Sequence, residues 1–144
     1  MTEEKQPGMA VVEQLMDAFM ALDLEAALGC FTDDAVVYDP HYPVPRMEGK
    51  EAIRQGFAWG IGNMEKPGFT VRHLWTDGES GAVEVDTNHV FKGGMTLEFE
   101  QVFVFETKDG KLTRLQSYVP YAPGGIGGFM AKATRWSWKL KGKA

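Results

Sequence analysis

Three side chains in this sequence carry groups suited to proton transfer: the carboxylate of Asp39, the imidazole of His89 and the amide of Gln101. Asp39 ends the apolar run AVVY and precedes a proline, which holds the backbone at the carboxylate in an extended conformation. His89 and Gln101 fall at apolar positions of alternating segments, where a buried polar group without a partner costs about 1–3 kcal/mol. We expect both to be satisfied within a core, or to face a cavity together with Asp39.

A cavity of this kind would support acid–base chemistry on a carbonyl compound. Apolar walls disfavour the charged form of a carboxylate, which makes Asp39 a stronger base for removing a proton next to a carbonyl. The enolate oxygen then needs hydrogen-bond donors, which the Gln101 amide or a protonated His89 would supply. His41, two residues after Asp39, is interpreted as a loop residue, with assistance to Asp39 as the alternative.

The first half of the chain has the spacing of helices with one short strand. A helix is predicted to begin near Pro7, because apolar residues recur at helical intervals from Val12 to Met20. Asp23 is a suitable N-cap for a short helix over 24–31. A strand is predicted over 35–39, followed by a proline-rich loop and a third helix over 50–61.

From residue 69 the period changes to two. Four alternating segments, over 69–76, 81–91, 95–107 and 111–121, are separated by short glycine-containing turns, which predicts an antiparallel meander. Helices followed by strands indicate an α+β domain with three N-terminal helices packed on a curved antiparallel sheet. Besides the three chemical groups, the residues expected to face a ligand are Phe19, His41, Val85, Thr87, Phe99, Phe103, Ser117 and Val119.

The C-terminal segment differs in charge from the rest of the chain. Residues 1–128 contain 10 basic and 20 acidic residues, whereas residues 129–144 contain five basic residues and no acidic one. GGIGG over 124–128 is predicted to be a hinge, followed by a basic amphipathic helix whose Phe129, Ala133, Trp136 and Leu140 share one face. We therefore divide the chain into a domain over 1–123 and a tail over 124–144, which could serve as a lid or as an interface.

Composition excludes several classes of protein. The 144 residues are 44% hydrophobic and 24% charged, as in one globular domain. A net charge of −5 disfavours a nucleic-acid partner. One cysteine, no signal peptide and no membrane-spanning run predict a cytoplasmic protein without a membrane partner. The three histidines lie far apart in the sequence, so no metal is expected, and no cofactor motif is present.

The segments DLEAALGCFTDDAVVYDP and GKEAIRQGF resemble the nuclear transport factor 2-like superfamily, and within it the SnoaL-like polyketide cyclases and ketosteroid isomerases. This resemblance implies a cone-shaped α+β fold, a hydrophobic ligand cavity and a homodimer. In the isomerases an aspartate is the base, and a tyrosine and a protonated aspartic acid form the oxyanion hole. Those positions match Asp39, Phe19 or its neighbour, and Gln101 respectively.

The resemblance implies a cofactor-free isomerase, cyclase or dehydratase that uses Asp39 as general acid or base. Some dehydratases of the superfamily use a histidine oriented by an aspartate, which an Asp39–His89 pair would resemble. Phe19 has no hydroxyl and Gln101 is not an acid, so the oxyanion hole of the isomerases is not reproduced. The alternative is a non-catalytic module of the same fold that binds a ligand or forms a dimer.

Overall fold

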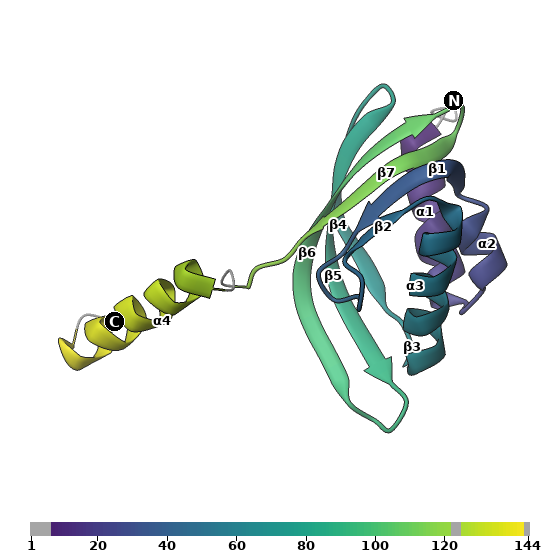
Figure 1. The fold of residues 1–144 in the computed structure, drawn as a ribbon. Helices are drawn as coiled ribbons and strands as arrows, with labels where there is room; N and C mark the ends of the chain where they lie inside the picture. The colour runs from purple at the N-terminus through teal and green to yellow at the C-terminus, as the bar shows by residue number, and fades with distance from the viewer. Residues whose placement is uncertain (1–6, 122–124, 143–144) are drawn as a thin grey trace.

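The computed structural model describes residues 7–121 and 125–142 and has an α+β architecture, with a curved, unclosed mixed sheet and four helices (Figure 1). The helices are α1 (Pro7–Met20), α2 (Leu24–Leu28), α3 (Lys50–Asn63) and α4 (Gly125–Leu140). The strands are β1 (Phe31–Tyr38), β2 (Arg46–Glu48), β3 (Met64–Lys66), β4 (Phe69–Asp77), β5 (Ser80–Phe91), β6 (Thr96–Lys108) and β7 (Lys111–Tyr118).

The first three helices lie on the concave side of the sheet (Figure 1). Helix α1 contacts β4, β6 and β7, α3 contacts β1 and β2, and α2 packs against both helices. Asp23 caps α2 as predicted, because its Oδ1 accepts a hydrogen bond of 3.0 Å from Ala26 N. Helix α2 ends at Leu28, and Phe31 already belongs to β1, so the second helix is shorter than predicted.

The sheet has the strand order β2-β1-β7-β6-β5-β3, and β4 also pairs with β5. The predicted antiparallel meander of β4, β5, β6 and β7 is confirmed, but the prediction of a wholly antiparallel sheet is wrong, because β1 pairs with β7 in parallel. A long connection separates these two strands in sequence, so local alternation carries no information on their relative direction. The three-residue strands β2 and β3 were not predicted, since three residues are too few to display a period.

The alternation of β5 and β6 sorts their residues onto the two faces as predicted. Val83, Val85 and Phe105 are fully buried under the helices, whereas Glu98 and Glu100 are exposed on the outer face. The concave face therefore supplies one wall of the interior, and its polar members, His89 and Gln101, are buried with it.

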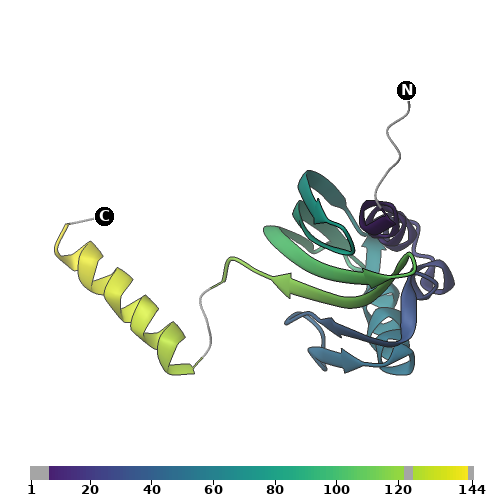
Figure 2. The ribbon, with the colours of Figure 1, turned by 90° about the horizontal axis from the view of Figure 1, so that it is seen from above.

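Helix α4 extends away from the sheet and the other helices (Figures 1 and 2). The predicted helix is present, but it begins at Gly125, so residues 125–128 of the predicted hinge are helical, while Gly124 lies outside the described residues. None of the helices in residues 7–121 and 125–142 is long and apolar enough to span a membrane.

Candidate active site

A cavity of about 250 Å³ lies between α1, α3 and the concave face of the sheet. Most of its wall is apolar, and six phenylalanine rings contribute to it: Phe19, Phe57, Phe69, Phe91, Phe99 and Phe103. The polar groups in the wall come from Asp39, His41, Tyr42, Asn63, His89 and Gln101. The aromatic residues therefore enclose a hollow instead of filling the interior.

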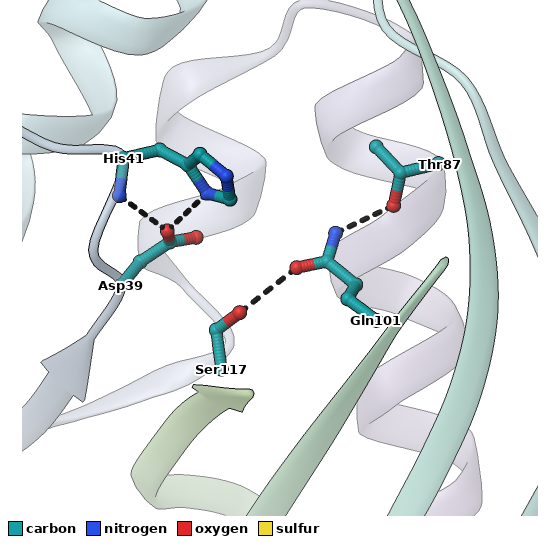
Figure 3. A network of polar contacts seen from close by, with 5 residues as sticks. All are labelled: Asp39, His41, Thr87, Gln101 and Ser117. Carbon is teal, nitrogen blue, oxygen red and sulfur yellow. Dashed lines mark hydrogen bonds and ion pairs between the residues drawn. The ribbon is translucent and has the colours of Figure 1, made fainter. Parts of the chain in front are cut away.

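The loop after β1 folds back on itself at Asp39. Asp39 N donates to Pro45 O at 3.0 Å, and Tyr42 N donates to Asp39 O at 3.2 Å. The same turn brings His41 onto the carboxylate, whose Oδ1 accepts from His41 N at 3.0 Å and lies 2.7 Å from His41 Nδ1 (Figure 3). His41 is thus a loop residue whose backbone N–H and ring both contact the Asp39 carboxylate.

The other nitrogen of His41 is available for chemistry. The Asp39 carboxylate is an acceptor, so it holds the hydrogen of the neutral ring on Nδ1 and leaves a lone pair on Nε2. His41 Nε2 is buried and has no hydrogen-bond partner among the residues that the structure describes. The ring packs against Phe99 and Tyr121, with centroid distances of 4.8 and 5.8 Å. The imidazole is therefore fixed at the cavity wall with one unused acceptor.

His89 is a neutral imidazole of the opposite tautomer. Its Nδ1 accepts a hydrogen bond of 3.1 Å from Gly68 N, so the ring hydrogen resides on Nε2. Burial is the main cause that lowers the pKa of His89 from its ordinary 6.5 to about 4. The lowered pKa disfavours a protonated His89, and the neutral ring still carries one N–H donor. Asp39 pairs with His41, so the pair considered between Asp39 and His89 is not formed.

Gln101 is the centre of a buried polar network that joins three strands (Figure 3). Its Nε2 donates to Thr87 Oγ1 of β5 at 2.5 Å, and its Oε1 accepts from Ser117 Oγ of β7 at 2.8 Å. Gln101 lines the cavity, but one N–H of its amide is already used within the sheet. The expectation that this residue is satisfied by its own structural partners describes it better than the expectation of a free donor.

The predicted ligand-facing residues divide into two groups. Phe19, His41, Phe99 and Phe103 line the cavity together with Asp39, His89 and Gln101. Four others do not line it: Val85, Thr87, Ser117 and Val119. Val85 is fully buried within the core, the two hydroxyls bond to Gln101, and Val119 follows the end of β7. Alternation identifies the face of the sheet on which a side chain lies, but not whether that side chain reaches the cavity.

Sequence reasoning missed several residues of the wall, among them Tyr42, Phe57, Trp59 and Phe69. Burial and the nearby Asp39 carboxylate raise the pKa of Tyr42, so its hydroxyl stays protonated and is a possible donor. The sequence feature that could have identified Tyr42 as a wall residue is its position in the proline-rich loop after Asp39. Within residues 7–121 and 125–142, no three His, Cys, Asp or Glu side chains are placed to hold a metal ion.

The family profile of the SnoaL-like domain matches residues 12–115, which include most of α1, the loop of Asp39 and most of the sheet. The chain belongs to the SnoaL-like family. The family resemblance inferred from sequence is thereby confirmed. No curated protein matches the sequence significantly.

Several solved structures have the same fold as this SnoaL-like protein at low sequence identity. A Δ5-3-ketosteroid isomerase from Mycobacterium sp. is 22% identical with a TM-score of 0.71, over 79% of this chain and 93% of that one. A Mycobacterium tuberculosis protein in complex with estradiol-17β-hemisuccinate is 22% identical with a TM-score of 0.71, over 79% and 94%. A computationally designed 17-OHP binder is 24% identical with a TM-score of 0.72, over 79% and 93%. These similarities establish the fold of the SnoaL-like protein.

Proposed function

We propose that this SnoaL-like protein binds a small, mostly apolar carbonyl compound and transfers a proton at the carbon next to the carbonyl. The observation that carries the proposal is the Asp39–His41 pair in the wall of an apolar cavity, with His41 Nε2 buried and unpaired. A cavity of about 250 Å³ is close to the lower end of small-molecule pockets, about 300–1,000 Å³, which favours a ligand of one or two rings.

The roles follow from the hydrogen bonds. His41 Nε2 takes the proton from the carbon, and the carbon–hydrogen electron pair moves into the carbonyl to form an enolate. The Asp39 carboxylate, 2.7 Å from Nδ1, stabilises the resulting imidazolium and keeps the ring oriented. In this proposal Asp39 takes part in acid–base catalysis through His41, whereas direct contact of Asp39 with the proton was expected from the sequence.

The enolate oxygen would be stabilised by neutral donors. His89 offers the N–H of Nε2, and its lowered pKa keeps the ring neutral at physiological pH. The Tyr42 hydroxyl, which also lines the cavity, is a second possible donor and compensates for the missing hydroxyl at Phe19. Donors that are fixed in a water-poor site stabilise developing negative charge more strongly than donors in water.

Three reaction types share this first step. Return of the proton to another carbon gives an isomer, attack of the enolate on a second carbonyl closes a ring, and loss of a β-hydroxyl as water gives an alkene. The neighbour described as a Δ5-3-ketosteroid isomerase carries out a reaction of the first type. The proposed activity is therefore that of a cofactor-free isomerase, cyclase or dehydratase.

A non-catalytic ligand-binding protein is the second candidate. It is favoured by Phe19 and by the Gln101 amide, because these positions lack the oxyanion donors of the isomerases. The designed 17-OHP binder is a neighbour whose name describes binding alone. Under this alternative His41 would contribute to ligand contact and not to proton transfer.

Exchange of ketone protons with solvent tests the first step without knowledge of the natural substrate. β-Tetralone, a two-ring apolar ketone, is incubated with the protein in heavy water, and loss of its α-protons is followed by NMR. The intact protein is expected to accelerate the exchange, and His41→Gln to reduce that acceleration by about 10²–10⁴-fold. His73→Gln, which changes an exposed histidine of β4, is the matched control and should exchange like the intact protein.

Binding is measured on the same samples by titration calorimetry, so that the two functions can be separated. Binding without acceleration would support the non-catalytic alternative, whereas acceleration that survives His41→Gln would contradict the role of His41 as the base. Failure of the intact protein to bind β-tetralone or related one- and two-ring ketones would count against both.

A further inference from the structure

Helix α4 presents an apolar surface that the rest of the described chain does not cover. Five of its large apolar side chains are between 61% and 80% exposed, namely Ile126, Phe129, Met130, Trp136 and Leu140. At about 100° per residue these five side chains fall within an arc of about 120°. A continuous apolar arc along a whole exposed helix is unusual for a surface that faces only water.

Basic side chains border one edge of this arc. Lys132, Arg135 and Lys139 occupy the adjoining sector of the helix, and Lys141 follows it. The sequence has no acidic residue after Asp109, so no carboxylate within α4 neutralises these charges. The helix thus combines an aromatic apolar face with a purely basic edge.

The position of α4 leaves both surfaces accessible. The helix extends away from the sheet and from α1, α2 and α3 (Figures 1 and 2). At a rise of 1.5 Å per residue, the 16 residues of α4 form a helix about 24 Å long. The basic side chains of this helix have the opposite charge to the acidic body formed by the rest of the chain. The separation allows the helix to meet a partner that the acidic body would repel.

We propose that α4 lies in the headgroup region of an anionic lipid membrane and holds the protein at its surface. The apolar arc would enter the boundary between headgroups and acyl chains, with Trp136 and Phe129 as aromatic anchors, and the lysine and arginine side chains would contact lipid phosphates. No spanning segment is needed for this mode of binding. The sequence prediction of no membrane partner rested on the lack of such a segment, and it does not apply to a helix that lies flat on the surface.

The outer sheet face of a second copy is the competing partner, since it carries carboxylates. Three of those carboxylates, on Asp86, Glu100 and Glu106, already lie beside an arginine side chain. Arg72 bonds to Asp86 at 3.0 Å and lies 3.2 Å from Glu100, and Arg114 lies 4.0 Å from Glu106. The pairs reduce the negative charge that this face offers to a basic helix, so anionic lipid is the better complement.

Vesicle sedimentation with the intact chain tests the proposal. The protein is expected to sediment with phosphatidylcholine vesicles that contain phosphatidylglycerol, and to remain in solution with phosphatidylcholine alone. Replacement of three charges (Lys132→Gln, Arg135→Gln and Lys139→Gln) should weaken binding on the order of 100-fold, because each basic residue near an anionic surface contributes about a factor of five. Phe129→Gln with Trp136→Gln should weaken it at least about tenfold. Thr134→Gln, on the remaining face, is the matched control and should bind like the intact chain.

Two further measurements make the result decisive. The emission of tryptophan should shift to shorter wavelength with phosphatidylglycerol vesicles, and circular dichroism should show that every variant keeps the fold. The proposal is overturned if the intact chain binds neither kind of vesicle. It is also overturned if the variant with Lys132, Arg135 and Lys139 replaced binds as well as the intact chain. Light scattering provides a further test, in which the intact chain could be a dimer and the Phe129 and Trp136 variant a monomer. If neither the intact chain nor this variant then binds vesicles, α4 is an interface between copies and the proposal is overturned.

Discussion

His41 Nδ1 lies 2.7 Å from Asp39 Oδ1, and the backbone N of His41 donates to the same oxygen at 3.0 Å. Two residues of one short loop thereby form a carboxylate–imidazole pair without help from any other element. The pair lies in the wall of the cavity, where His41 Nε2 is buried and the imidazole packs against Phe99. The pair is local in sequence, whereas its environment is assembled from the helices and the sheet.

Replacement of the carboxylate should separate orientation from charge. Asp39→Asn keeps an acceptor oxygen for His41 N, but it removes the negative charge that stabilises the imidazolium. We expect the acceleration of β-tetralone proton exchange to fall by about 10²-fold or more, while ketone affinity changes less than about threefold. Asp109→Asn, in the turn between β6 and β7, is the control. An equal loss of affinity and exchange would mean that Asp39 acts in binding and not in proton transfer.

His89 should make the protein less stable in mild acid. Its pKa is about 4 when folded and about 6.5 when unfolded, so between these values the unfolded chain binds the proton and the folded protein does not. The contribution of His89 to the free energy of unfolding is therefore complete above pH of about 6.5 and is lost as the pH falls toward about 4, by on the order of 2 kcal/mol.

Urea denaturation of the intact protein and of His89→Gln across this pH range measures the contribution. The variant should lose less stability on acidification than the intact protein, and His73→Gln should behave like the intact protein. Equal pH dependence of the intact protein and His89→Gln would contradict a neutral, buried His89.

The Gln101 network should contribute more to stability than to ligand binding. Thr87→Val preserves the shape of the side chain but removes the acceptor of Gln101 Nε2, which leaves a buried donor unpaired. The free energy of unfolding should fall by about 1–3 kcal/mol. Thr70→Val, on an exposed position of β4, should cost much less. The free energy of ketone binding could instead change more in Thr87→Val than the free energy of unfolding does. That result would mean that the Gln101 amide contacts the ligand.

Filling the cavity should abolish binding without unfolding the protein. Val83 is fully buried and lines the hollow, so the ring of Val83→Phe would occupy space that is open to a ligand. We expect ketone affinity to fall about tenfold or more, with a loss in the free energy of unfolding of no more than about 1–3 kcal/mol. Val104→Phe, on the outer face of the neighbouring strand, adds the same ring outside the cavity. Unchanged affinity in Val83→Phe would place the binding site elsewhere.

Much of the architecture could be predicted because it depends on local patterns. The alternation over β5 and β6 placed His89 and Gln101 on the buried face, and the proline after Asp39 ended the strand close to the carboxylate. The site was harder to predict. Alternation placed Val85 and Thr87 beside His89 on the buried face, but the depth of each side chain depends on the helix packed above it.

The sequence by itself determined that three helices precede the meander, which strands form the meander, and which face of β5 and β6 is buried, because these properties repeat within a few residues along the chain. Only the tertiary structure decided that β1 runs parallel to β7, that His41 and not His89 pairs with Asp39, and that the aromatic residues enclose a hollow. The physical reason is that these three relationships depend on distances across the fold and on the volume left between packed side chains. A one-dimensional period encodes neither quantity.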